Sequence, residues 1–346
     1  MKIAIHHTPG SFSDKWLEYC REQHIDAKMV NCFDSDILSQ LEDCDGLMWH
    51  WAHWDYMAVQ FARQLTYSLE HVGKRVFPDS KTCWHYDDKV GQKYLLEAVG
   101  APLVPSYVFY DKHTALEWLD KTDYPKVFKL RRGAGSANVI LVKSKSQANK
   151  LVRRAFGGGF SPVNRMSLFK DRTWHLKRDK DLRALIGIFK GLARLVVPTR
   201  LEQNTHKDKG YAYFQDFIPD NTFDTRIIVI GNRAFGIKRM VRENDFRASG
   251  SGLIQHAKDN IDMSCIRSSF MVSQRIGSQC LAFDYIFKDK RPLLTEISYA
   301  FLQSGYGDCP GYWDERLSWH EGPFYPECFM VEDFVRRLDN KSGPNK

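Results

Sequence analysis

The amino-acid sequence predicts a mixed α/β protein: a small parallel sheet at the N-terminus, then further subdomains that contain hairpins. Three observations predict this class. Apolar strands alternate with helices through about the first eighty residues, closely spaced strands with hairpin turns follow residue 212, and 346 residues exceed what one core usually organises. We therefore expect a parallel-sheet domain over 1–85 and two or three packed subdomains in all.

Composition excludes several classes of protein. Hydrophobic residues make up 43% and charged residues 27% of the chain, which excludes disordered, collagenous and coiled-coil proteins. No apolar run approaches the roughly 18 residues of a transmembrane helix, and the first residues lack the apolar region of a signal peptide, so we expect a cytoplasmic protein. The eight cysteines are scattered singly, which favours free buried thiols over disulfides.

The net charge of +8 is concentrated in one segment. Residues 161–210 hold twelve Lys and Arg against five Asp and Glu. Such a basic arm suits a phosphate-bearing ligand, an anionic membrane surface or an acidic polymer, and a solvated helical insertion over 157–210 is an equal alternative. No nucleic-acid-binding motif accompanies the charge, so no nucleic-acid partner is expected.

Residues 1–85 show the pattern of a parallel sheet. A buried strand at 2–5 precedes a helix through Trp16 and Cys20, which Ser13 is placed to cap. Further expected elements are strands at 27–33, 45–50 and 75–77 and a helix at 58–71. This alternation of strand and helix predicts parallel neighbours.

The middle of the chain predicts a glycine-bearing loop between two strands. The expected elements are helices at 89–99, 115–119 and 146–156 and strands at 106–110, 126–130 and 138–142. Lys129 interrupts an apolar strand, which is costly unless its ammonium group meets an anion. The loop 131–136 follows this strand, and its backbone N–H groups are suited to close over phosphates.

The last third of the chain predicts antiparallel strands with two carboxylates among them. The expected elements are strands at 212–218, 224–230, 234–239, 280–287 and 293–297 and helices at 182–197, 264–276 and 331–338. Asp284 and Glu296 interrupt two apolar strands that form a hairpin. Antiparallel pairing can place both on one face, where they repel unless a cation bridges them, and Mg²⁺ with phosphate oxygens is the usual solution. Pairing with neighbouring arginines is the alternative.

The order of these features resembles the ATP-grasp superfamily of carboxylate–amine ligases, in its glutamate-ligase branch. The resemblance covers about residues 85–300, and it includes segments similar to the DxR, basic and DFRxS motifs at 224–226, 238–239 and 245–249. It implies a pre-ATP-grasp α/β domain over 1–85 and a two-lobed ATP-grasp domain, with a lid lobe over 86–211, a C-terminal lobe over 212–346 and the nucleotide between two antiparallel sheets. It implies ATP binding by Lys89, Lys129, Gly133, Gly135, Ser136, Gln215, Asp216, Phe217, Ile218, Asp224 and Lys238, metal binding by Asp284, Glu296 and Ser298, and catalysis by Arg239 and Arg247.

One position departs from the family pattern. Ser298 stands where the Glu-x-Asn metal motif of the family has Asn. A serine hydroxyl is also an oxygen ligand for Mg²⁺, but its shorter side chain favours contact through water. The resemblance therefore implies one or two Mg²⁺ ions together with ATP.

The activity that the resemblance implies is an ADP-forming ligase, in which an amine attacks an acylphosphate to form an amide. The tail after residue 299 resembles a subgroup associated with bacterial surface-polysaccharide biosynthesis, so the substrates would be a small-molecule or sugar carboxylate and an amine acceptor. The candidate acceptor-binding residues are Arg226, Tyr306, Asp308, Trp313, Trp319 and His320. Packing of these aromatic side chains on the core is an equal alternative.

Two other functions agree with the same features. One is a kinase with the same fold that phosphorylates a sugar or polyol without an amine. The other is a non-catalytic ATP-binding adaptor that docks through the basic segment 157–210, on an anionic surface for example. A homodimer is compatible with the sequence.

Overall fold

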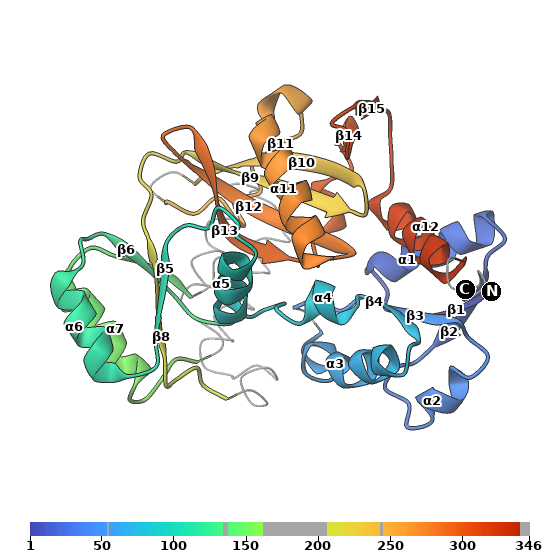
Figure 1. The fold of residues 1–346 in the computed structure, drawn as a ribbon, viewed down its shortest axis with the longest axis horizontal. Coiled ribbons are helices and arrows are strands. Elements are labelled where there is room, and N and C mark those ends of the chain that lie inside the picture. Colours follow the sequence, from blue (N-terminus) through green and yellow to red (C-terminus); the bar gives the residue numbers. More distant parts are fainter. Residues whose placement is uncertain (54, 134–137, 162–205, 243–244, 340–346) are drawn as a thin grey trace, which may run out of the picture. The chain divides into compact units, whose positions relative to one another are not determined.

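The computed structural model describes residues 1–53, 55–133, 138–161, 206–242 and 245–339. These residues fall into two compact units (Figure 1). The first unit comprises Met1–Tyr86, Tyr94–Leu103 and Asn221–Lys346, and the second comprises Asp87–Lys93 and Val104–Asp220. The mixed α/β class with one parallel and two antiparallel sheets is confirmed, while the domain boundaries expected after residues 85 and 211 stay a prediction.

The first unit begins with a four-stranded parallel sheet of order β2-β1-β3-β4. Its elements are β1 (Lys2–His6), α1 (Phe12–Glu22), β2 (Asp26–Val30), α2 (Ile37–Gln40), β3 (Gly46–Trp49), α3 (Tyr56–His71), β4 (Arg75–Phe77) and α4 (Ser80–Cys83). The expected cap of α1 is wrong by two residues. The Ser11 side chain accepts the Ser13 N–H, and Ser13 lies inside the helix.

The same unit holds a seven-stranded antiparallel sheet of order β13-β12-β9-β10-β14-β15, with β11 on β10. Its strands are β9 (Phe223–Ile230), β10 (Arg233–Met240), β11 (Ile254–Gln255), β12 (Cys280–Lys288), β13 (Arg291–Ser298), β14 (Gly311–Asp314) and β15 (Trp319–Glu321). We call this sheet the large sheet. Helix α11 (Met263–Ile276) covers one face, where it packs with Ile227 and Phe283 (Figure 1).

On its other face, the large sheet packs at one end with α1 and α12 (Pro326–Asp339). Ile228 and Ile230 of β9 share this core with Ile3 of β1 and Phe334 of α12. Helix α12 begins five residues earlier than expected, and the β14–β15 hairpin was not expected from the sequence. At the opposite end, this face of the large sheet carries charged side chains, among them Arg226, Asp284 and Glu296.

The second unit is a four-stranded antiparallel sheet of order β5-β8-β6-β7 with two helices on one face (Figure 1). Its elements are β5 (Ser106–Phe109), α6 (Lys112–Lys121), β6 (Lys126–Lys129), β7 (Val139–Val142), α7 (Lys145–Ala155) and β8 (Ala212–Asp216). Apolar residues of α6 and α7 pack on Phe128 and Phe214. Most of the basic segment, with the helix expected at 182–197, lies outside the described residues.

The cysteines and the helices test two of the expectations from the sequence. All eight cysteines are free, and all but Cys328 are buried, which confirms the expected thiols. None of the described helices has both the length and the apolar character needed to cross a membrane.

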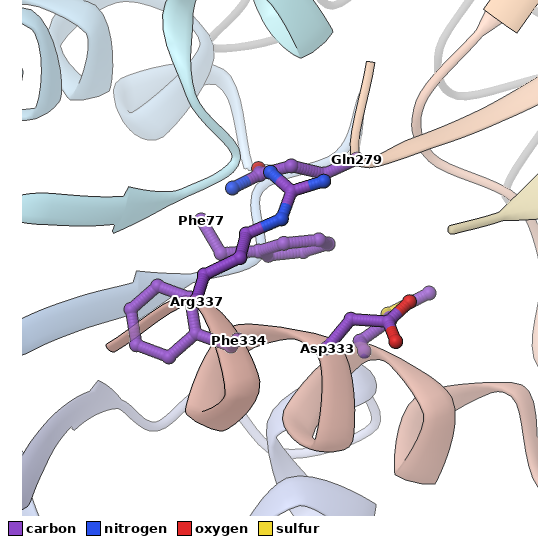
Figure 2. Close-up of a pocket in the computed structure, with 6 residues that line it drawn as sticks. Phe77, Gln279, Asp333, Phe334 and Arg337 are labelled. Carbon is purple, nitrogen blue, oxygen red and sulfur yellow. The ribbon is translucent and has the colours of Figure 1, made fainter. Parts of the chain in front are cut away.

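A small cavity lies where α12 meets β4 and the start of β12 (Figure 2). Its lining residues are Phe77, Gln279, Met330, Asp333, Phe334 and Arg337. It has room for about one water molecule. The Gln279 side chain joins the two sheets here, since it accepts the Asp79 N–H and donates to the Val76 carbonyl oxygen. The cavity is therefore a structural junction that is too small for a substrate.

Two histidines are buried in the core of the first unit. The His50 ring stacks on Phe12 at a centroid distance of 3.7 Å, and its Nδ1 accepts the Phe12 N–H at 3.2 Å. Burial lowers the pKa of His50 and of His85 to about 3. Both are therefore neutral in the folded protein at pH values where an unfolded histidine, with a pKa near 6.5, is charged.

We expect stability to fall as the pH drops below about 6.5. Between about pH 6.5 and pH 3 the unfolded chain binds protons at these histidines that the folded chain does not, so the free energy of unfolding rises with pH in this window. Each histidine should contribute a loss of about 1.4 kcal/mol per pH unit. Urea denaturation at several pH values checks this. His50→Gln should reduce the slope, while His113→Gln, whose native side chain is 82% exposed, should not; a flat wild-type profile would contradict the prediction.

Candidate active site

Lys89, the first residue of α5 (Lys89–Ala98), contacts the glycine loop of the second unit. Its N–H donates to the Arg131 carbonyl oxygen at 2.9 Å, and its Nζ donates to the Gly133 carbonyl oxygen at 2.8 Å. The Gly133 N–H in turn donates to Asp87 Oδ1 at 2.8 Å. The amide of Gly133 is thus engaged within the protein, and the expected phosphate contacts at 135 and 136 lie outside the described residues.

Lys129 and Gln215 lie on the same face of the second unit's sheet. Phe128 and Phe214 are cross-strand partners that pack against α6 and α7. Because side chains alternate along a strand, the neighbouring Lys129 and Gln215 point to the opposite face. Both are buried, and Gln215 Nε2 donates to Ser106 Oγ at 3.0 Å. Lys129 and Gln215, two of the residues expected to bind ATP, therefore share one face.

Asp216 lies on the other face of this sheet, beside the helices. Its Oδ1 accepts Lys126 Nζ at 2.7 Å, and its N–H donates to the Pro105 carbonyl oxygen. Phe217 and Ile218 follow directly after the strand. Lys126 was not expected at this position from the sequence, although its spacing of two residues from Phe128 indicates that it faces the helices. The carboxylate of Asp216 is thus committed to a structural ion pair.

In the first unit, three charged side chains form a row across three strands of the large sheet. Asp284 on β12 lies opposite Glu296 on β13 and opposite Arg226 on β9. Residues directly opposite each other share a face. Arg226 Nε and Nη2 donate to the two Asp284 oxygens at 2.5 and 2.6 Å. The register thus places both predicted metal carboxylates on one face, and Asp284 is paired with an arginine there.

A second arginine–carboxylate pair adjoins this row. Arg239 donates to both Asp224 oxygens at 2.6 Å, and its Nη2 lies 3.1 Å from Asp284 Oδ2. Burial acts to raise the pKa of Asp284, but the guanidinium groups of Arg226 and Arg239 outweigh it and hold that pKa well below its usual range. Two carboxylates and two guanidinium groups therefore form a charge-balanced cluster, which we call the arginine–aspartate cluster.

Ser298 and Tyr306 border the arginine–aspartate cluster. Ser298 lies two residues beyond Glu296 on the same face, and its Oγ donates to the Ala300 carbonyl oxygen at 2.7 Å. The Tyr306 ring packs on Phe235 and is 5% exposed. Burial raises the pKa of Tyr306, and the nearby Arg226 opposes that shift. The structure thus brings two expected acceptor residues together: Arg226, which is part of the cluster, and Tyr306, which borders it.

Comparison with known proteins supplies the fold. No family model matches the sequence, and no curated protein matches it. Among solved structures, a RimK domain ATP-grasp protein from Sphaerobacter thermophilus DSM 20745 is 14% identical with a TM-score of 0.54, covering 97% of this chain and 100% of that one. D-alanine–D-alanine ligase from Bacillus anthracis complexed with ATP is 11% identical, with a TM-score of 0.55 and 99% coverage of both chains. The D-cycloserine synthetase DcsG is 14% identical, with a TM-score of 0.57, covering 98% of this chain and 100% of that one. This chain has the ATP-grasp fold.

Within this ATP-grasp fold, the donor set on β12 and β13 suits Mg²⁺ held jointly with a phosphate ligand. Mg²⁺ is usually bound by one or two carboxylates together with substrate phosphates. Asp284 and Glu296 supply two opposed carboxylates, and Ser298 adds a hydroxyl oxygen. Among the described residues, no group of three or more His, Cys, Asp or Glu side chains could hold a metal ion. Asp284 and Glu296 are thus oxygen donors of the kind that bind Mg²⁺ together with a phosphate, and in this structure Asp284 is paired with Arg226.

Some residues expected at the site lie on the opposite face of the large sheet. Lys238 is the cross-strand partner of Thr225, and its Nζ lies 3.8 Å from the centroid of the Phe223 ring. Trp313 pairs with Ala234 and packs on Trp319 at a centroid distance of 4.6 Å. This face belongs to the α11 side of the core. Side chains alternate between the two faces along each strand, and Lys238, Trp313 and Trp319 point to the face opposite Asp284. The large sheet therefore separates these three residues from Asp284.

The remaining expected residues make local contacts. Arg247 Nη2 donates to Asp245 Oδ2 at 2.7 Å in the segment between β10 and β11. Asp308 is exposed, and His320 Nε2 lies 3.0 Å from Asp314 Oδ2 on the β14–β15 hairpin. Their roles in catalysis or acceptor binding stay predictions.

Proposed function

We propose that the protein is an ATP- and Mg²⁺-dependent ligase that joins a carboxylate to an amine. The observation that carries the proposal is the row of Arg226, Asp284 and Glu296, with Arg239 beside it, on one face of a sheet in a chain with the ATP-grasp fold. The placement of Lys89 at the glycine loop supports the proposal from the second unit.

The charged residues would have distinct roles toward ATP. Lys89 and Lys129 would contact phosphates, and the backbone after Gln215 would contact the adenine. Asp284 and Glu296, with Ser298 beside them, would hold Mg²⁺, which when bound neutralises charge on the phosphate groups. Arg226 and Arg239 would supply guanidinium groups suited to bind the transferred phosphoryl group.

The proposed reaction has two balanced steps. A carboxylate oxygen of the substrate attacks the γ-phosphorus of ATP, ADP leaves, and an acylphosphate forms. The amine nitrogen then attacks the acyl carbon, inorganic phosphate leaves with the electrons of the C–O bond, and the nitrogen loses a proton as the amide forms. The arginines offset the charge that develops on the acyl oxygen. Exclusion of water by the glycine loop would protect the acylphosphate from hydrolysis.

The finer proposal concerns the substrates. We infer a sugar-derived or other small-molecule carboxylate and an amine, used in bacterial surface-polysaccharide biosynthesis. The resemblance of the tail after residue 299 supports this assignment, and Tyr306 beside Arg226 provides an aromatic ring next to a cation at the same face. Trp313 and Trp319 do not add to it, because they lie on the opposite face of the sheet.

The experiment that tests the function measures binding first and turnover second. Mg²⁺ with ATP at about 100 times the dissociation constant should stabilise the native protein by roughly 2.7 kcal/mol in thermal unfolding. Carboxylate and amine pools are then screened for ADP release. Release that requires both supports the ligase, a phosphorylated product without an amine selects the kinase, and stabilisation without ADP release selects a non-catalytic ATP-binding protein. Absence of any stabilisation by ATP overturns all three.

A further inference from the structure

The first residue of the glycine loop is held by a tyrosine from outside the loop. The Arg131 N–H donates to Tyr211 Oη at 2.6 Å, and Tyr211 Oη donates to Asp208 Oδ1 at 3.2 Å. Burial raises the pKa of Tyr211, so its hydroxyl keeps its proton and remains a donor to the carboxylate. The chain from Asp208 through Tyr211 therefore ends on the backbone of the loop.

Asp208 is itself fixed by a short antiparallel bridge. Phe160 and Asp208 exchange two backbone hydrogen bonds of 2.9 Å, and the Arg154 guanidinium carbon lies 4.5 Å from the centroid of the Phe160 ring. Gly159 has a φ of +69°, and a Cβ there would lie 2.8 Å from the Asp208 carbonyl oxygen, so this approach requires glycine. We call this bridge the neck, because it joins the two ends of segment 161–207.

The Asp208 carboxylate is buried, and the charges of Arg132 and Arg131 oppose the rise in its pKa that burial causes. The residue is 7% exposed, and its Oδ2 atom is buried without a hydrogen-bond partner among the described residues. An incompletely satisfied buried carboxylate costs stability. We therefore expect Asp208 to matter more for the position of Tyr211 than for the free energy of unfolding.

Arg131 is held from both sides of its backbone. Tyr211 accepts from its N–H, and its carbonyl oxygen accepts the Lys89 N–H at 2.9 Å. Two residues later, Gly133 is held on both its N–H and its carbonyl oxygen by Asp87 and Lys89. These contacts determine where the chain enters the rest of the glycine loop.

We propose that Asp208 and Tyr211 are a positioning pair that links the neck to the glycine loop and sets the loop for ATP phosphates. This inference rests on the proposed function, in which the loop contacts ATP. Loss of the pair should leave the lysines in place but release the backbone of Arg131, so that the start of the loop is no longer fixed before ATP binds. The expected result is weaker ATP binding with little change in the unliganded fold.

Tyr211→Phe tests the pair, with Tyr124→Phe as the matched control. Tyr124 lies in the same unit and loses one hydrogen bond to a backbone carbonyl, that of Leu119, when its hydroxyl is removed. Two quantities are measured for each variant: amide hydrogen exchange at Arg131 without nucleotide, and the dissociation constant for ATP with Mg²⁺. Tyr211→Phe removes the hydrogen bonds to Arg131 and Asp208; it should speed exchange at Arg131 at least about tenfold and weaken ATP binding about five- to tenfold, as expected when the contact that holds Arg131 is lost. Tyr124→Phe should change neither quantity.

Rescue at Asp208 separates positioning from general stability. Asp208→Asn keeps an oxygen that accepts from Tyr211 and should retain ATP affinity within about twofold, whereas Asp208→Ala should match Tyr211→Phe. The double variant Asp208→Ala/Tyr211→Phe should be no weaker than either single variant, because the two act through one contact. Unchanged ATP affinity in Tyr211→Phe, or unchanged exchange at Arg131, overturns the proposal. If the wild type binds no ATP, the proposed function fails, and the exchange measurement alone decides whether Tyr211 holds the loop.

Discussion

Glu296→Gln should remove the stabilisation by Mg²⁺ and ATP and lower turnover by more than about 100-fold, with little loss of stability in the unliganded protein. The amide keeps the size of the side chain but withdraws one of the two charges opposed on β12 and β13. A charge interaction with Mg²⁺ and phosphate is worth several kcal/mol in such a site, and about 2.7 kcal/mol corresponds to 100-fold. Thermal unfolding with and without Mg²⁺ and ATP, followed by ADP release, checks this.

Asp284→Asn should produce the same loss of ligand response together with a loss of stability. Unlike the change at Glu296, it takes a charged partner away from the buried Arg226 and Arg239. Breaking a buried pair in this way typically costs about 3–5 kcal/mol. Asp259→Asn is the control, because Asp259 is an exposed carboxylate of the same unit and should leave both quantities unchanged. Retention of the full Mg²⁺-dependent shift in both Glu296→Gln and Asp284→Asn would refute the metal assignment.

The sequence predicts the strands that carry the candidate site because their signal is local. Hydrophobic alternation locates β9, β10, β12 and β13 to within about two residues, and the hairpin turn between β12 and β13 fixes their antiparallel pairing. From that pairing alone, Asp284 and Glu296 can be expected on one face, and the register confirms it. For Asp284 the structure shows the alternative, pairing with arginines, and its binding of Mg²⁺ stays a prediction.

What the sequence does not predict depends on register between distant strands. Arg226 and Asp284 are 58 positions apart, and nothing local indicates that they are cross-strand partners. The local sequence also does not predict which face of the sheet Trp313 occupies. That face is set by the pairing of Trp313 with Ala234, which is distant in the sequence. Adjacent residues such as Lys238 and Arg239 point to opposite faces, so a motif that contains both cannot place both at one site.

Arg239→Met should lower the free energy of unfolding by about 3–5 kcal/mol, because it leaves the buried Asp224 without its bidentate partner. Asp224→Asn in the same chain should restore a large part of that loss, since the remaining carbonyl and amide carry no net charge. Urea denaturation of the wild type, both single variants and the double variant gives the coupling energy of the pair.

The exposed pair of Lys15 and Glu18 provides the comparison for that cycle. Its atoms are 2.6 Å apart, the same separation as in the buried pair, but both side chains are at least one-third exposed. Surface pairs typically contribute about 0.2–1 kcal/mol, because water screens both charges. A large coupling at Arg239 and Asp224 with a small one at Lys15 and Glu18 would show that burial, and not distance, gives the arginine–aspartate cluster its strength. Equal couplings would mean that water reaches the cluster, and the low pKa of Asp284 would then lose its structural basis.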